Sequence, residues 1–134
     1  MAKRLILISH GQFCEALKAS TEMIMGSQEM IETVSLLPEE GAADFQEKFL
    51  ATLGGDRQVI VLADLLGGTP CNVVSRLIME GYDLSLYAGA NMPMVIEFIN
   101  SAMIGQEPAL TAGGAQGIIH VNDLLANLAD SDDD

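Results

Sequence analysis

Apolar runs alternate with segments of helical spacing along most of the chain. Residues 5–9 and 58–63 are continuous apolar runs, the pattern of strands that are buried on both faces of a sheet. With three further runs they give the predicted strands, which are residues 5–9, 31–36, 58–63, 84–88 and 118–121. Apolar residues recur at helical spacing between the strands, and the predicted helices are residues 12–25, 39–53, 69–79 and 91–104. Residues 105–117 are predicted to be irregular, and a short helix is predicted after residue 121.

Four successive units of strand followed by helix predict an α/β fold. We expect a doubly wound, mainly parallel sheet with strand order 2-1-3-4 and helices on both faces. Neither an internal repeat nor a linker divides the sequence, so residues 1–128 are interpreted as one domain. Residues 129–134 form an acidic tail that is predicted to be disordered. Ligands of such sheets bind beyond the carboxyl ends of the strands, so the loops after the first, third and fourth strands are the ones to search.

Composition and charge narrow the classes of function. The 134 residues are 49% apolar, enough for one core, and they carry a net charge of −13. Such an acidic surface repels nucleic acid and anionic membranes, and it attracts basic partners. No apolar run reaches the ~20 residues of a membrane span, and the first run is too short for the core of a signal peptide. Cys14 and Cys71 fit no metal-ligand spacing, so we expect a cytoplasmic protein with free thiols, without a metal or a cofactor.

His10 and Asp64 are the first candidates for chemistry. His10 directly follows the first predicted strand, and Asp64 ends the third. These strands are neighbours in the order 2-1-3-4, so both side chains are expected at the same edge of the sheet. A carboxylate that accepts a hydrogen bond from the Nδ1–H of a histidine leaves Nε2 free as a nucleophile. By position alone, a structural histidine and a carboxylate that caps a turn remain open alternatives.

Glycines and a predicted helix start accompany these two residues. Gly11 can open a sharp turn from strand to helix, and Gly67 and Gly68 let the backbone approach a ligand closely. Thr69 is expected to cap the helix that Pro70 begins. The unpaired N–H groups of a helix start suit a phosphoryl group, to which a threonine hydroxyl can also donate. Taken alone, Gly-Gly-Thr-Pro is an ordinary capped turn; beside a histidine and a carboxylate it favours a phosphoryl site.

Three motifs together resemble a known family. Ser9-His10-Gly11, Asp64 to Pro70 (DLLGGTP) and Gly89 to Met94 (GANMPM) follow the first, third and fourth predicted strands. In this order and spacing they resemble the mannose-family enzyme IIA domain of the bacterial sugar phosphotransferase system. The resemblance covers the chain from Lys3 to about Leu128 and leaves out only the acidic tail.

The resemblance implies a role for each candidate residue. His10 would accept a phosphoryl group from the phosphohistidine of the small carrier HPr. It would pass that group to a IIB component, which phosphorylates sugar during transport through a membrane IIC/IID complex. Asp64 would be the carboxylate partner of His10. The residues expected to hold the phosphoryl oxygens are Gly11, Gly67, Gly68 and Thr69.

The resemblance also implies a homodimer. Subunits of this family exchange a C-terminal strand that is antiparallel to the others, and here that strand would be residues 118–121. His120 lies inside this run and is interpreted as a packing or hydrogen-bonded histidine. The sequence leaves the sugar open among mannose, fructose, sorbose and amino sugars.

Three other readings of the chain remain. A related phosphocarrier serves phosphoenolpyruvate-dependent dihydroxyacetone kinases, but its third loop lacks Gly-Gly-Thr-Pro. A receiver-like signalling domain would be phosphorylated on Asp64, but it needs a lysine after its fifth strand, and no lysine follows Lys48. A regulatory domain that only binds would not need His10, Asp64 and Thr69 together. Chemistry separates the phosphorylated forms, because phosphohistidine is lost in acid and survives alkali, whereas an acyl phosphate is lost in alkali.

Overall fold

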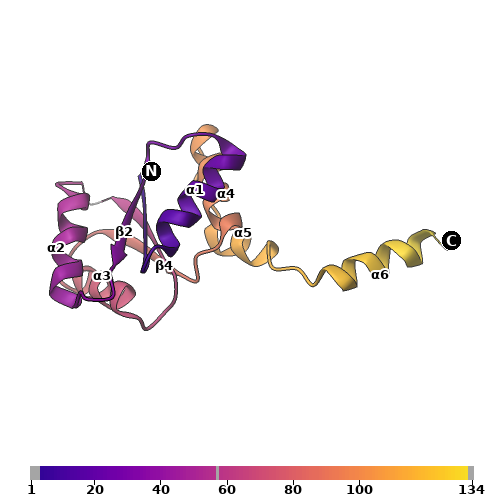
Figure 1. The fold of residues 1–134 in the computed structure, drawn as a ribbon. Coiled ribbons are helices and arrows are strands. Elements are labelled where there is room, and N and C mark those ends of the chain that lie inside the picture. The colour runs from indigo at the N-terminus through magenta and orange to yellow at the C-terminus, as the bar shows by residue number, and fades with distance from the viewer. Residues whose placement is uncertain (1–3, 57, 133–134) are drawn as a thin grey trace.

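The computed structural model, which describes residues 4–56 and 58–132, has a four-stranded sheet with helices on both faces (Figure 1). The strands are β1 Leu5–His10, β2 Ile31–Leu36, β3 Val59–Ala63 and β4 Leu84–Ala88. The helices are α1 Phe13–Met25, α2 Ala42–Leu53, α3 Thr69–Met79, α4 Met92–Met103, α5 Leu110–Gln116 and α6 Val121–Asp132. The first four predicted strands and helices are confirmed, with small shifts at their ends. None of the helices in this part of the chain is long and apolar enough to cross a membrane.

All four strands are parallel, and their order is β2-β1-β3-β4, as the sequence predicts. β1 therefore lies between β2 and β3, in the centre of the sheet. Ile8 of β1 is paired with Ala63, the last residue of β3. Beyond this pair, β1 continues through Ser9 to His10, and β3 is followed by Asp64. Both His10 and Asp64 therefore lie at the same edge of the sheet.

Two cores, one on each face of the sheet, explain why β1 is apolar throughout. Ile6 and Ile8 pack in the core under α2 and α3, with Phe45 and Phe49 of α2. Residues of β1 on the opposite face, such as Leu7, pack in the core under α1 and α4. Because both faces are covered by helices, alternation of polar and apolar residues is not needed in this strand.

The stretch between α4 and residue 118 contains a helix that the sequence did not predict. α5 includes Gly113 and Gly114, which lower helix propensity. Both glycines lie against the α4 segment: a Cβ atom at Gly113 would be 3.1 Å from Glu97, and the Gly114 carbonyl accepts a hydrogen bond from Asn91 Nδ2 at 3.1 Å. The prediction of irregular structure at 105–117 is therefore wrong for α5, because close packing against α4 outweighs local propensity.

The predicted C-terminal strand is absent from the single chain. Residues 118–120 form no strand, and α6 already begins at Val121. A strand exists only where a neighbouring strand completes its hydrogen bonds, and an apolar run does not reveal whether its own chain supplies that neighbour. His120 is exposed and does not pack in a core, and its Nδ1 lies 3.0 Å from Asp123 Oδ2, so of its two predicted roles the structure supports the polar contact.

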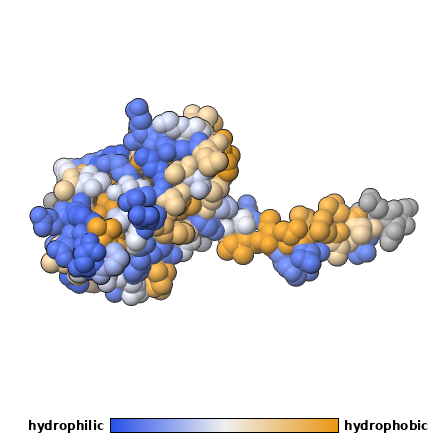
Figure 2. Space-filling view, in the orientation of Figure 1, coloured by the Kyte–Doolittle hydropathy of each residue, from blue (hydrophilic) through white to orange (hydrophobic). Residues whose placement is uncertain are grey.

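The acidic tail also differs in part from its prediction. Residues 129–132 continue α6, whereas Asp133 and Asp134 lie outside the described residues. α6 extends away from the body of the molecule (Figure 1). Figure 2 shows apolar side chains along this helix. The exposed apolar residues of α6 are Val121, Leu124, Leu125 and Leu128.

Candidate active site

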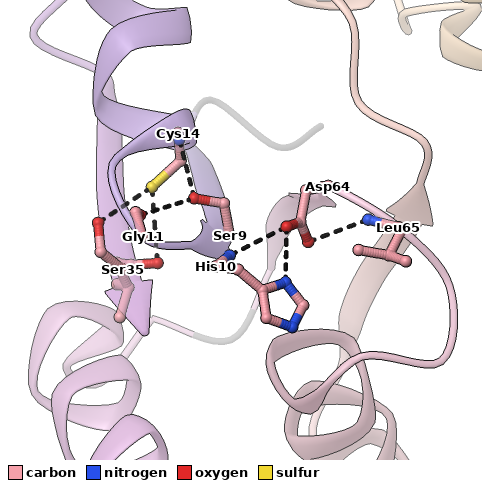
Figure 3. A network of polar contacts seen from close by, with 8 residues as sticks. Ser9, His10, Gly11, Cys14, Ser35, Asp64 and Leu65 are labelled. Carbon is pink, nitrogen blue, oxygen red and sulfur yellow. Dashed lines mark hydrogen bonds and ion pairs between the residues drawn. The ribbon is translucent and has the colours of Figure 1, made fainter. Parts of the chain in front are cut away.

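The structure brings His10 and Asp64 together at the carboxyl edge of the sheet (Figure 3). His10 is the last residue of β1, and Asp64 directly follows β3. Oδ2 of Asp64 lies 2.8 Å from His10 Nδ1 and also accepts the backbone N–H of His10 at 2.9 Å. One carboxylate oxygen thus holds both the backbone and the ring of the histidine.

The Asp64 carboxylate is mostly buried, with 13% of its side chain exposed. Burial alone would raise its pKa, but the hydrogen bonds from the His10 backbone N–H, the His10 ring and the Leu65 N–H outweigh burial and lower the pKa below 3.8. The carboxylate is therefore ionised at neutral pH and can only accept hydrogen bonds. Nδ1 of His10 must then carry a proton, so in the neutral ring the lone pair is on Nε2, on a side chain that is 46% exposed.

Gly68 packs directly against the His10 ring. A Cβ atom at position 68 would lie 2.9 Å from His10 Nε2 and closer still to Cε1. Gly68 is also the N-cap residue of α3, in an extended conformation that leads into the helix. The start of α3, whose first N–H groups have no partner within the helix, therefore lies beside the free nitrogen of His10.

The other candidate residues, in the turn after β1 and at the start of α3, have different surroundings. Gly11 adopts a φ of +56°, and its N–H donates to the Leu36 carbonyl at 2.7 Å, so this N–H is already used. Gly67 is exposed, with a φ of +89°. Thr69 is half-buried and is the first residue of α3. It is not the N-cap residue that the sequence predicted, because Gly68 already occupies the position before the first helical residue.

The sequence analysis included Ser9 only as part of the Ser9-His10-Gly11 motif and assigned it no role of its own. Ser9 is completely buried, and its hydroxyl contacts the turn that follows His10. The signal was present in the sequence, because a serine at the end of an otherwise apolar strand needs a hydrogen-bond partner. Cys14 and Cys71 are both buried free thiols.

A family model described as the PTS system fructose IIA component matches residues 4–112. The chain belongs to the mannose-type IIA family of the sugar phosphotransferase system (PTS). Components of this family are phosphotransferases that act in sugar transport. The resemblance seen in the sequence motifs is thereby confirmed, and the receiver-like alternative is left without support.

Curated relatives support the family assignment. The chain is 34% identical over 98 residues to the fructose-specific EIIA component of Bacillus subtilis, with 71% of this chain and 67% of that protein covered. It is 33% identical over 100 residues to the mannose-specific EIIAB component of Escherichia coli K12, with 72% of this chain covered. The matched part spans only 31% of the length of that E. coli protein.

Solved structures support the same assignment. The mannose/sorbose-specific IIA subunit from Enterococcus faecalis is 36% identical, with a TM-score of 0.75 over 89% of this chain and 94% of that one. A phosphotransferase system EIIA component from Streptococcus agalactiae is 26% identical, with a TM-score of 0.81 over 90% of this chain and 98% of that one. Both likenesses extend over most of this chain.

Proposed function

We propose that the chain is a cytoplasmic phosphocarrier in which His10 accepts a phosphoryl group from the phosphohistidine of HPr and passes it to a IIB component. The observation that carries this proposal is the state of the His10 ring. Nδ1 is bound to an ionised carboxylate, while Nε2 is free and lies beside the start of α3. The family of the chain supports the same reaction class.

The chemistry follows from this ring geometry. The lone pair of Nε2 attacks the phosphorus of the donor, the new N–P bond forms, and the electron pair of the breaking N–P bond returns to the donor imidazole. Positive charge develops on the His10 ring as Nε2 bonds to phosphorus. Asp64 lies 2.8 Å from Nδ1 and stabilises this charge without giving up or taking a proton. Transfer to IIB is the same step in reverse, so the site must not hold the phosphoryl group tightly.

The start of α3 is the proposed cradle for the phosphoryl oxygens. Its free N–H groups and the positive end of the helix dipole favour an anion next to Nε2. We assign Gly67, Gly68 and the Thr69 hydroxyl to this role, because Gly68 lies against the His10 ring and Thr69 is the first residue of α3. Gly11 has its N–H on the Leu36 carbonyl, so we assign it to the turn rather than to the phosphoryl group.

The surface around His10 suits protein donors and acceptors. Four large apolar side chains of the neighbouring loops and of the start of α1 are exposed, namely Phe13, Leu37, Leu65 and Leu66. Each belongs to a segment that begins or ends at the edge of the sheet where His10 lies. Apolar contacts around the histidine, on a chain with a net charge of −13, fit a protein partner that has an apolar centre and a basic rim.

We also propose that the chain forms a homodimer through its C-terminal segment. Ile118 and Ile119 are exposed, and α6 leaves its apolar residues uncovered. A helix of 12 residues is marginally stable unless another surface covers its apolar face. The outer edge of β4 borders a cavity of about 340 Å³ that Leu86, Ile78 and Leu66 help to line. The exchanged segment of a second copy would pair with this edge and fill the cavity.

Transfer of label from phosphorylated HPr tests the proposed function. We expect the purified chain to gain one phosphoryl group that is lost in acid and survives alkali, the signature of phosphohistidine. The His10→Ala variant should take up none, because the only other histidine in the sequence is His120, which directly precedes α6 and not α3. His120→Ala is the matched control and should be labelled as fully as the native chain, since His120 is exposed and directly precedes α6.

Two results would contradict the proposal. Full labelling of the His10→Ala variant would assign the phosphoryl group to another residue. A label that is lost in alkali would indicate an acyl phosphate, and Asp64 would then be the residue to test.

A further inference from the structure

Ser9 is a buried hydroxyl at the end of an otherwise apolar strand. None of Ser9 is exposed, although the next residue, His10, reaches the surface. Burying a hydroxyl costs free energy unless hydrogen bonds replace those to water. The partners of the Ser9 hydroxyl therefore indicate what this serine does.

Both partners of Ser9 belong to the segment that follows His10. The Ser9 hydroxyl accepts the backbone N–H of Cys14 at 2.8 Å and donates to the carbonyl of Gly11 at 3.1 Å (Figure 3). One side chain thus joins the end of β1, the turn after it and the first turn of α1. His10 lies within the loop that these two hydrogen bonds close.

Ser9 also replaces the usual cap of α1. The N-cap residue Gln12 makes no side-chain hydrogen bond to the helix, and Cys14 is the second residue of α1. A Ser, Thr, Asp or Asn at the N-cap normally accepts an N–H group in this first turn. Here the acceptor comes from β1 instead, so the start of α1 is fixed to the strand that carries His10.

Three contacts together fix the backbone on both sides of His10. Asp64 accepts the N–H of His10, the Leu36 carbonyl accepts the N–H of Gly11, and Ser9 holds the Gly11 carbonyl. Gly11 adopts a φ of +56°, and glycine moves through many other conformations at little cost. Without the Ser9 hydroxyl, the carbonyl of Gly11 loses its only side-chain hydrogen bond among the described residues.

We propose that Ser9 is a positioning residue for phosphoryl transfer, whose hydroxyl holds the turn so that Nδ1 of His10 stays on Asp64 and Nε2 faces the start of α3. This inference rests on the proposed function of His10. Ser9 itself contacts neither the reacting nitrogen nor the cradle; it acts through the backbone of the turn.

Ser35 provides a matched control for this role. It is the register partner of Ser9 on β2 and is also buried, with 6% exposed. Its hydroxyl donates to Glu15 Oε1 at 2.9 Å and lies 3.4 Å from Cys14 Sγ, so its partners are side chains and not the turn after His10. We expect removal of either hydroxyl to lower the free energy of unfolding by a similar amount. Only removal of the Ser9 hydroxyl is expected to affect the His10 ring.

The test compares Ser9→Ala with Ser35→Ala in the full chain. We expect Ser9→Ala to slow transfer from saturating phosphorylated HPr by about tenfold with little change in KM, because misplacement of a reacting group lowers the rate and not the docking. In the unphosphorylated protein, ¹⁵N NMR should show a smaller fraction of the His10 ring with its proton on Nδ1. Ser9→Thr keeps the hydroxyl and should restore both readouts, and Ser35→Ala should leave both at native values.

The proposal is overturned if Ser9→Ala keeps the native rate and ring signals, or if Ser35→Ala changes them as much. Should Ser9→Ala fail to fold, Ser9→Cys carries the same comparison, because a thiol has a similar shape but makes weak hydrogen bonds. If the native chain takes up no phosphoryl group, the proposed function fails. The NMR comparison does not depend on transfer and still decides whether Ser9 holds the ring.

Discussion

The His10 ring lies between a carboxylate that orients it and a glycine that leaves room for it. Asp64 fixes the proton on Nδ1, and Gly68 packs against the side of the ring that carries Nε2. Sequence reasoning placed Gly68 among the phosphoryl-binding residues because glycine lets a backbone approach a ligand. In the structure the nearest group to Gly68 is the histidine itself, which gives a second reason for glycine at this position.

Adding one methyl group at position 68 tests this packing. A Cβ atom there would lie 2.9 Å from Nε2, so the ring in Gly68→Ala must move away from Asp64 and the start of α3. We expect phosphoryl transfer from HPr to fall by about 100-fold, since small misplacements of reacting atoms have effects of this size. The melting temperature should change little, because the backbone of Gly68 has a φ of −86° that alanine adopts readily. Rate and melting temperature are measured on the same preparations.

Gly55→Ala is the matched control for this substitution. A Cβ atom at Gly55 would meet nothing within 4 Å, so transfer should keep its native rate. Native transfer by Gly68→Ala would show that the ring has room to adjust without leaving Asp64.

Among the elements, the central strands β1 and β3 are joined by side-chain hydrogen bonds in addition to their backbone pairing. The Asp64 carboxylate after β3 accepts the N–H and the ring of His10 at the end of β1. These hydrogen bonds require the ionised carboxylate, so they link the stability of the sheet edge to pH.

The sign of this pH dependence follows from the lowered pKa of Asp64. The hydrogen bonds exist only in the folded chain, so the unfolded chain takes up the proton first as the pH falls. The stabilisation is complete above the ordinary value of 3.8 and is lost as the pH falls through the lower folded pKa. Compared with Asp64→Asn, the native chain should be more stable by about 1 kcal/mol at neutral pH.

Urea unfolding of both proteins between neutral and strongly acidic pH measures this difference. We expect it to shrink as the pH falls below 3.8, while the other carboxylates affect both proteins alike. A difference that stays constant or grows toward acid pH would show that Asp64 is not stabilised as an anion.

For the molecule as a whole, the exposed apolar residues after α5 remain uncovered within the described part of a single chain. The body has two packed cores, but residues 118–120 and α6 leave large apolar side chains exposed. Monomeric proteins seldom leave an extended segment of this kind uncovered, which is the physical support for a dimer that exchanges it.

Sedimentation of the full chain tests the dimer. We expect the native chain to sediment as a dimer and Ile119→Asp to sediment as a monomer, because a charge at this apolar position prevents burial in the partner. Met23→Asp is the matched control and should remain dimeric, since Met23 is an apolar residue on α1 that is even more exposed than Ile119 and lies outside the C-terminal segment. A native chain that is monomeric at all concentrations would contradict the exchange.

The sequence by itself determined the layered architecture and the first elements of the site. Continuous apolar runs identified β1 and β3, and the repeated order of strand and helix made the sheet parallel. His10 and Asp64 could be paired because strand ends in such a sheet meet at one edge. These features are encoded locally, since each depends on residues that are neighbours in the chain or on the handedness of short connections.

Only the tertiary structure decided the rest. Ser9 proved to hold the turn, the Gly11 N–H proved to be occupied, and Gly68 proved to lie against the ring, because each depends on atoms from distant segments. α5 forms despite two glycines because α4 is there to pack against. The run at 118–121 has the composition of a strand but remains unpaired in the single chain, since a strand needs a neighbour and composition does not say which chain provides it.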